Sequence, residues 1–131
     1  MKGLSFHKID EDYSKIKYLE LECVMNMETG YVNVTEFCSS SGKNISDYLV
    51  SDKYNDLITE YTEEGSSAGN RQTINGVVYF HPLLFMDLAS WISTDAHVMA
   101  SRIVADFFFK KFTEREEDIR TLYISSFGRN P

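Results

Sequence analysis

The amino-acid sequence predicts a single α+β domain with an N-terminal β-hairpin, a second β-hairpin and C-terminal helices. The first observation is size, because 131 residues give a soft prior of one domain. The second is composition, since 43% apolar and 25% charged residues are typical of a globular chain rather than a disordered one. The third is the order of periodic segments along the chain, taken here from the N-terminus.

The N-terminal segments predict two paired strands. Residues 1–16 are polar and mixed in charge, so we expect a tail or an edge segment there. From Lys17 to Cys23 polar and apolar residues alternate, which predicts a strand with one wet face. Residues 26–30 form a turn cluster whose glycine can adopt a positive φ, and residues 31–34 return as a second strand. These segments make up the expected N-terminal β-hairpin.

Two short helices are expected next, separated by a tight turn. Thr35 is expected to cap a helix over residues 36–40, which Gly42 ends in a left-handed conformation. Ser46–Asp47 is expected to cap a second short helix that contains residues 48–50. The order helix, Gly-Lys turn, helix is the first sign of a helix-turn-helix arrangement.

A longer helix and the second hairpin follow. Residues 53–64 have the clearest amphipathic pattern, with apolar side chains at i, i+3, i+4 and i+7: Tyr54, Leu57, Ile58 and Tyr61. Residues 65–70 form a flexible loop rich in glycine and serine. Residues 71–74 and 77–80 are predicted to pair through a type I′ turn at Asn75-Gly76, which is the strongest short hairpin signal.

Helices are expected to complete the domain. Pro82 suits the first turn of a helix over residues 83–92, and this segment is apolar nearly all round, so we expect it to be buried. A last long helix is expected over residues 95–112. In the extension 113–131, residues 122–124 are expected to pack back as a short strand or helix end.

The order of these elements is that of a winged helix-turn-helix domain. The expected organisation is an N-terminal segment 1–16, a domain at 17–112 and an extension 113–131. A short helix fits the major groove of DNA, and a hairpin wing can reach an adjacent groove or the backbone. The fold by itself does not decide function, because many winged-helix domains bind only proteins.

Composition and motifs exclude several classes of protein. A net charge of −7 argues against a polybasic nucleic-acid binder. Two cysteines without CxxC spacing predict neither a disulfide framework nor a zinc site. There is no signal peptide, no apolar run of membrane-spanning length, no G-x-S-x-G motif and no phosphate-binding glycine loop. We therefore expect an intracellular protein that is not an enzyme, has no membrane partner and uses no cofactor or metal.

Four blocks of sequence resemble the KilA-N domain, a family of large DNA viruses and phages related to the fungal APSES DNA-binding domains. The blocks are Gly30–Cys38, Gly42–Leu49, Tyr79–Leu83 and Ala89–Ser93, and the resemblance covers about residues 17–112. It implies a compact α+β fold that binds DNA through the helix-turn-helix and the wing, and we expect duplex DNA as the partner. It leaves open whether the compartment is a viral factory, the host nucleus or the cytoplasm.

Seven residues are the candidate DNA contacts. The helix-turn-helix would contribute Lys43, Asn44, Ser46 and Lys53, and the wing would contribute Asn70, Arg71 and Gln72. Lysine can meet phosphate or guanine and asparagine can read adenine, whereas the alternatives are turn chemistry, an N-cap, a solvated helix end and a solvent loop. Residues 36–80 carry three basic and seven acidic groups, a balance of −4 that bounds the phosphate contribution to binding.

Other prominent residues are assigned structural roles. Asn33 and Thr35 are expected to organise the strand-to-helix turn, and His81 to be a buried, hydrogen-bonded histidine. Trp91 and Phe107–Phe109 are expected to lie mostly in the core, but three consecutive phenylalanines cannot all face one side of a helix. An exposed member would suit a homo-oligomer or a protein partner. The alternative function is accordingly an acidic protein-interaction module that has lost DNA binding.

Overall fold

A computed structural model describes residues 3–127, and side chains are described up to Glu114. These residues form one mixed α+β domain whose sheet has six antiparallel strands in the order β1-β2-β3-β4-β6-β5. The strands are β1 (Leu4–Lys8), β2 (Tyr13–Tyr18), β3 (Leu21–Asn26), β4 (Val32–Asn33), β5 (Arg71–Ile74) and β6 (Val77–Phe80). The helices are α1 (Val34–Ser40), α2 (Ile45–Leu49), α3 (Asp52–Glu63), the 3₁₀ turn η1 (Ser67–Gly69), α4 (Pro82–Ile92) and α5 (Thr94–Phe127). The predicted α+β class is confirmed.

The N-terminal strands differ from the expected hairpin. The single strand expected from Lys17 to Cys23 is divided by a two-residue turn at Leu19 and Glu20, and Leu19 adopts φ +55° with an exposed side chain. A turn of two residues does not change which positions are apolar, so the alternation of polar and apolar residues continues from β2 into β3. Ile16 and Cys23 therefore lie opposite each other in the core. The first sixteen residues contain the edge strand β1 and most of β2.

The sheet consists of two three-stranded halves with a short join. Strands β3 and β4 are connected through the pair Met25–Val32, and β4 continues to β6 through the pair Val32–Phe80. All three of these side chains are fully buried. Helix α1 extends the join, because the Ser40 hydroxyl accepts from the Glu22 amide (3.0 Å) and donates to the Phe37 carbonyl (2.8 Å). The two hairpins are thereby fixed around one core.

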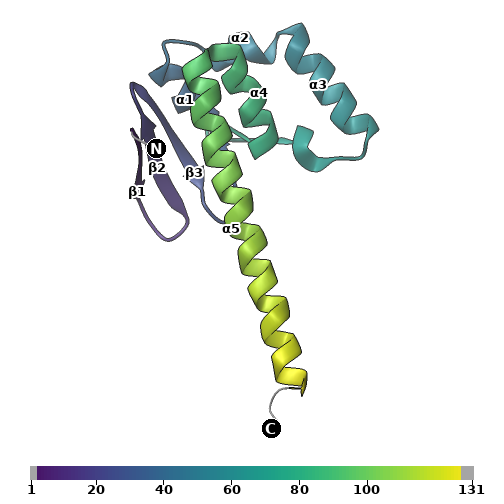
Figure 1. Ribbon diagram of the computed structural model, residues 1–131. Coiled ribbons are helices and arrows are strands. Elements are labelled where there is room, and N and C mark those ends of the chain that lie inside the picture. The colour runs from purple at the N-terminus through teal and green to yellow at the C-terminus, as the bar shows by residue number, and fades with distance from the viewer. Residues whose placement is uncertain (1–2, 128–131) are drawn as a thin grey trace.

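The core lies between the inner face of the sheet and helices α1, α4 and α5 (Figure 1). Phe37 of α1 meets Phe85 of α4 edge to face at 5.0 Å between ring centroids. Cys23 and Cys38 are both fully buried and free, and burial raises the pKa of each thiol, to about 12 for Cys38. The apolar character expected of the segment 83–92 is explained by this position, since α4 is covered on most sides.

The second hairpin and the amphipathic helix α3 are confirmed. Asn75 has φ +52° and Gly76 φ +79°, which fit the expected type I′ turn between β5 and β6. Helix α3 turns its apolar stripe inward, where Tyr54 is buried and Leu57, Ile58 and Tyr61 are partly buried. The loop expected before β5 contains the 3₁₀ turn η1, whose Ala68 is buried.

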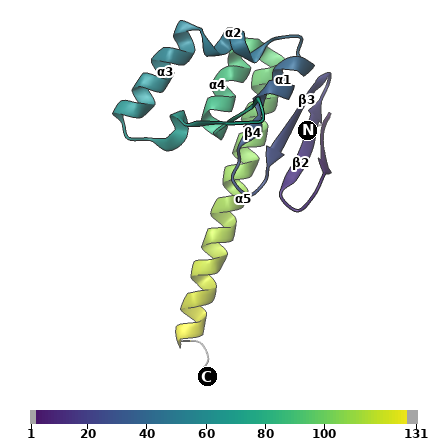
Figure 2. The same ribbon diagram turned by 180° about the vertical axis from the view of Figure 1, so that it is seen from behind.

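Helix α5 is much longer than expected. It runs from Thr94 to Phe127 instead of ending at residue 112, and its second half extends away from the domain (Figures 1 and 2). The expectation that residues 122–124 pack back as a strand or helix end is wrong, because the backbone there is still helical. The segment after Phe112 continues the helix because its Glu and Arg residues are good helix formers. Within the described part of the chain, no helix has the length and apolar character needed to cross a membrane.

Candidate nucleic-acid interface

The turn between α1 and α2 and the first turn of α2 together hold three of the seven candidate residues. Asn44 is the N-cap of α2, and its side-chain oxygen accepts from the Ser46 amide at 2.8 Å. The expectation that Ser46 caps this helix is therefore wrong, because the asparagine two residues earlier occupies that role and Ser46 lies exposed in the first turn. Lys43 precedes this cap, and its backbone amide donates to the Cys38 carbonyl at the end of α1.

A similar correction applies to the strand-to-helix turn before α1. Asn33 is the N-cap and accepts from the Glu36 amide at 3.0 Å, whereas Thr35 was expected to take this role. The Thr35 hydroxyl instead accepts from the Val78 amide at 2.9 Å, which ties α1 to β6. The wider expectation that Asn33 and Thr35 organise this turn is confirmed.

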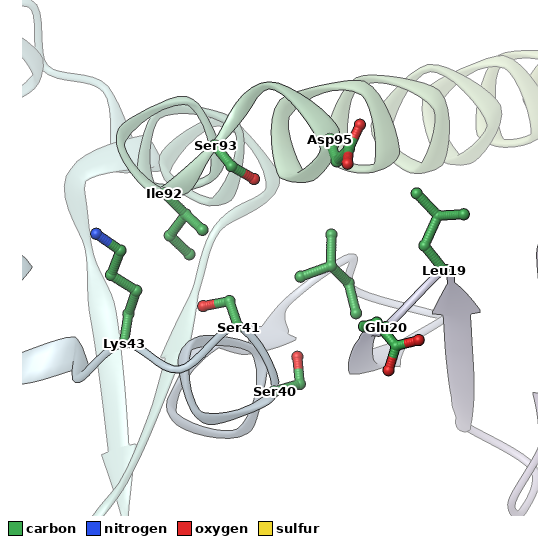
Figure 3. A pocket seen from close by; sticks show the side chains of 9 residues that line it. Leu19, Glu20, Ser40, Ser41, Lys43, Ile92, Ser93 and Asp95 are labelled. Atoms are coloured by element: carbon green, nitrogen blue, oxygen red, sulfur yellow. The ribbon is translucent and has the colours of Figure 1, made fainter.

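Lys43 lies over an aromatic ring at the edge of a pocket. Its Nζ atom is 5.3 Å from the centroid of the Trp91 ring, within the range of a cation–π interaction. The pocket has a volume of about 470 Å³, and Figure 3 shows Lys43 at one side of it and Leu19 and Asp95 at the other. With Asp95 and Glu20 on its wall, the interior of this pocket disfavours an anion. Lys43 is available to phosphate from the rim only.

Lys53 is held by helix α4. Its Nζ atom lies 3.6 Å from Asp87 Oδ1 and 3.1 Å from the Ser90 hydroxyl oxygen. Asp87 Oδ2 also accepts a short hydrogen bond from the Tyr48 hydroxyl. Burial, followed by this hydrogen bond and the charge of Asp87, raises the pKa of Tyr48 far above its ordinary value. Lys53 is thus partly neutralised by a carboxylate that sits in the same cluster.

The wing residues lie at the start of β5 and do not share one face. Arg71 pairs with the buried Phe80 and covers Tyr54, with the guanidinium carbon 5.9 Å from the ring centroid and a 3.4 Å hydrogen bond to the hydroxyl. Gln72 pairs with Tyr79, so strand alternation places it on the opposite face of the hairpin. Asn70 is exposed at the end of η1.

An aromatic cluster connects the three candidate cations. The cluster consists of Tyr48, Tyr54, Phe80 and Trp91, with the Tyr48 centroid 5.2 Å from Tyr54, 6.0 Å from Phe80 and 5.4 Å from Trp91. Lys43 contacts it at Trp91 and Arg71 contacts it at Tyr54, while Lys53 reaches it through Asp87. Residues from α2, α3, β5, β6 and α4 are thus organised around one aromatic centre.

The solvent-facing side of α3 carries the opposite charge. Its exposed acidic residues recur three or four positions apart and therefore form one stripe along the helix: Asp52, Asp56, Glu60 and Glu63. This acidic stripe accounts for most of the −4 balance of residues 36–80. The acidic residues of α3 are thus gathered on its solvent-exposed face, which is therefore negative.

Two partners of the candidate residues were not found by sequence reasoning. No function was assigned to Asp87 from the sequence. It is the one charged residue in the apolar segment 83–92, and a lone charge in a buried helix indicates that it has a polar partner. Trp91 was expected to lie in the core, but it is half-buried, which leaves its ring open to Lys43.

His81 forms a hydrogen bond as expected but is only half-buried. It is the N-cap of α4, and its Nδ1 atom accepts from the Leu83 amide at 3.1 Å. Desolvation lowers the pKa of its imidazole. Among the residues with described side chains, no group of three His, Cys, Asp or Glu residues is placed to hold a metal ion.

The sequence model of the KilA-N domain matches residues 16–110. The chain belongs to the KilA-N domain family. The matched KilA-N segment begins in β2 and ends in α5, so it contains all seven candidate residues. KilA-N domains are generally DNA-binding.

Related KilA-N proteins occur in large DNA viruses. A protein of Acanthamoeba polyphaga mimivirus whose name includes the KilA-N domain is 27% identical over 131 residues, covering 91% of this chain and 38% of that protein. One of Invertebrate iridescent virus 6 is 25% identical, covering 91% of this chain and 37% of its own length. An uncharacterized fowlpox virus protein is 26% identical over 102 residues, covering 69% of this chain and 68% of its own length. The chain thus spans under two-fifths of the first two relatives, and no solved structure matches it significantly.

Proposed function

We propose that this chain binds duplex DNA, without catalysis, through the surface formed by the start of α2, the start of α3 and the β5–β6 hairpin. In this proposal the elements act as a winged helix-turn-helix of the kind found in APSES-like proteins. Lys43 and Arg71 meet phosphates, and Asn44, Ser46, Asn70 and Gln72 add polar contacts to sugar, phosphate or base edges.

One observation carries the proposal. Lys43 and Arg71 flank the same aromatic cluster, and among the described residues neither lies within 4 Å of a carboxylate. Both cations are positioned by aromatic rings, which restrict the side chain but leave the positive charge uncompensated. A cation held in this way can bind a phosphate without first breaking an ion pair.

The acidic stripe constrains how DNA is approached. If α3 presented Asp52, Asp56, Glu60 and Glu63 to the backbone, like charges would oppose each other. The proposed orientation therefore directs the start of α2, the side of α3 that carries Lys53, and the hairpin toward DNA, and turns the acidic stripe of α3 toward solvent. Gln72 still contributes, because a hairpin that enters a groove presents both of its faces.

The salt dependence of binding follows from the number of available cations. Two phosphate contacts give a slope of log K against log salt near −1.8, and three give about −2.7 if Lys53 leaves Asp87. Raising salt from about 50 to about 200 mM would then weaken binding roughly 12-fold to 40-fold. We expect the weakening to be close to 12-fold, because Lys53 is already paired with Asp87 and is not counted as a phosphate contact.

The test is fluorescence anisotropy with a mixed-sequence duplex at both salt concentrations. The variant Lys43→Ala/Arg71→Ala should lose most of its affinity and most of its salt dependence. Lys8→Ala/Lys17→Ala is the matched control, since it also removes two exposed cations, which lie on the sheet, and it should change binding little. Equal affinity of the double variant and the control would disprove this choice of contacts, although DNA binding itself would stand.

The acidic stripe also favours a second candidate function. A balance of −4 over residues 36–80 would complement a basic protein partner, which suits a protein-interaction module on the same fold that has lost DNA binding. Absence of binding to duplex DNA at about 50 mM salt would favour this alternative.

A further inference from the structure

Two apolar surfaces are not used by the proposed DNA contacts. On α5, Phe107 is 8% exposed but Phe108 and Phe109 are 45% and 74% exposed, so only one of the three consecutive phenylalanines lies in the core. The other surface is a groove between α3 and α4 with a volume of about 330 Å³. This groove, unlike the surface of α5, has walls and a charged rim that indicate the chemistry of an occupant.

The groove follows α3 and α4, which meet at one end. There Lys53, at the start of α3, contacts Asp87 at 3.6 Å and Ser90 at 3.1 Å, near the end of α4. Away from this end the two helices stand apart (Figures 1 and 2). The apolar side chains on the walls of the groove are not fully buried: Leu57, Tyr61, Leu83 and Met86. We call this feature the α3–α4 groove.

Carboxylates dominate the rim of the α3–α4 groove. Burial and, to a lesser extent, the nearby charges of Asp87 and Glu64 raise the pKa of the Tyr61 hydroxyl on its wall. Glu60 is exposed one turn before Glu64 on the same side of α3. With histidine counted as neutral, these three carboxylates are opposed by Lys53 alone among the described residues that border the groove, so its rim is negative.

The walls of the α3–α4 groove favour a helical occupant. Helices α3 and α4 have 12 and 11 residues, and their backbone N–H and C=O groups bond within each helix. An extended peptide would therefore find no strand edge to pair with, whereas a helix satisfies its own backbone and needs only side-chain contacts. An amphipathic helix presents apolar anchors at i, i+3, i+4 and i+7, which suit a groove lined by Leu57, Leu83 and Met86.

We propose that the α3–α4 groove binds a basic amphipathic helix of a partner protein. The apolar face of that helix packs on the walls of the groove, and lysine or arginine residues along its flank meet Glu60 and Glu64. The proposal rests on the second candidate function, for which it specifies the site and the class of partner. It is independent of DNA binding, so the duplex DNA titrations and the peptide titrations below can fail separately.

The test titrates the chain into a fluorescein-labelled peptide of about 18 residues and measures fluorescence anisotropy without DNA. The leucines of this peptide follow the helical spacing, and all its other residues are lysine. We expect saturable one-to-one binding with a Kd below about 100 µM at about 50 mM salt. A peptide of the same composition with its leucines spread around the helix should bind at least about tenfold less tightly. Equal binding of the two peptides would mean nonspecific charge attraction and would overturn the proposal.

Variants of the chain locate the binding site. Leu83→Lys removes an apolar part of the wall and repels the peptide, so it should raise the Kd at least about tenfold. Ile9→Lys is the matched control, since Ile9 is 51% exposed in the turn between β1 and β2 and receives the same charge. Glu60→Gln/Glu64→Gln should weaken binding more than Glu11→Gln/Glu20→Gln, which removes two exposed carboxylates from the turns on either side of β2.

The outcomes separate the proposed partner from a second copy of the chain. Peptide binding that neither Leu83→Lys nor Glu60→Gln/Glu64→Gln weakens beyond its control would overturn the proposal. The second variant changes only exposed side chains, so it decides the matter if circular dichroism shows that Leu83→Lys is unfolded. If light scattering shows that the free chain is a dimer and that Leu83→Lys dissociates it, the groove binds a second copy and the proposal is wrong.

Discussion

At the scale of single residues, Asp87 limits what the candidate interface can do. It accepts a hydrogen bond from Tyr48 and pairs with Lys53, so one carboxylate fixes a buried tyrosine and restrains a cation. For Lys53 to reach a phosphate it must give up Asp87, and the exposed pair is worth at most about 1 kcal/mol. Lys53 is therefore expected to contribute less to DNA affinity than Lys43 or Arg71.

His81 makes stability depend on pH. Its folded-state pKa lies below the ordinary value of 6.5 because desolvation disfavours the charged ring, and Nδ1 must stay unprotonated to accept from Leu83. Above pH 6.5 this contribution is fully present, and it is lost as the pH falls through 6.5 toward the lower folded-state pKa.

Urea denaturation at pH 7.5 and pH 5 should therefore show a lower unfolding free energy at the acidic pH. In His81→Asn, which keeps an N-cap acceptor but does not titrate, this decrease should be smaller. An equal decrease in both proteins would contradict the role assigned to His81, since carboxylates titrate alike in both.

Sequence reasoning located individual side chains better than their partners. Lys43 and Arg71 could be selected because each is a cation in a turn or at the start of a strand, and both features are local. Their contacts with Trp91 and Tyr54 could not be predicted, since these join positions far apart in the chain. The caps were misplaced by two residues because Asn, Ser and Thr all cap helices, and only the backbone shows which one does.

At the scale of elements, periodicity identified those segments that bury one face. Helix α3 and the β5–β6 hairpin were predicted because amphipathic spacing and an Asn-Gly turn are strong local signals. The division of the first strand at Leu19 was missed, since a leucine with φ +55° is not what turn statistics favour. The length of α5 was missed because its last turns are not stabilised by the domain.

Gly30 shows how tightly the elements meet. With φ +83°, it lies in the turn between β3 and β4, where an added Cβ would be 2.7 Å from both Phe107 and Pro82. Gly30→Ala should therefore combine backbone strain of about 1–2 kcal/mol with a steric clash of about 1–3 kcal/mol.

The matched comparison is Gly42→Ala, where φ is +80° and nothing lies within 4 Å of the added carbon. Chemical denaturation should show only the strain component for Gly42→Ala. Equal losses at the two sites would mean that α4 and α5 can move away from Gly30 without cost.

At the scale of the whole molecule, the net negative charge opposes DNA binding, but the positions of the acidic residues still allow it. The chain carries a net charge of −7, yet much of the negative charge near the interface lies on the acidic stripe of α3. Long-range repulsion is therefore expected to lower affinity even though Lys43 and Arg71 are not paired with a carboxylate among the described residues.

Reversing part of the acidic stripe should raise DNA affinity. Asp56→Lys/Glu60→Lys changes the net charge by four units, from −7 to −3, next to the interface. We expect at least about a fivefold gain in anisotropy titrations at about 50 mM salt, decreasing at higher salt. Glu11→Lys/Asp106→Lys changes the net charge equally on other parts of the fold and should gain less. An equal gain would mean that overall charge, and not its position, governs binding.

The two enclosed cysteines have a practical consequence. Because Cys23 and Cys38 are fully buried and remain protonated, thiol reagents reach them only in molecules that have opened their interior. The rate at which the native chain reacts with a thiol reagent therefore reports how often it unfolds, at one position on a strand and one on a neighbouring helix. While it stays folded, the chain also resists oxidative cross-linking.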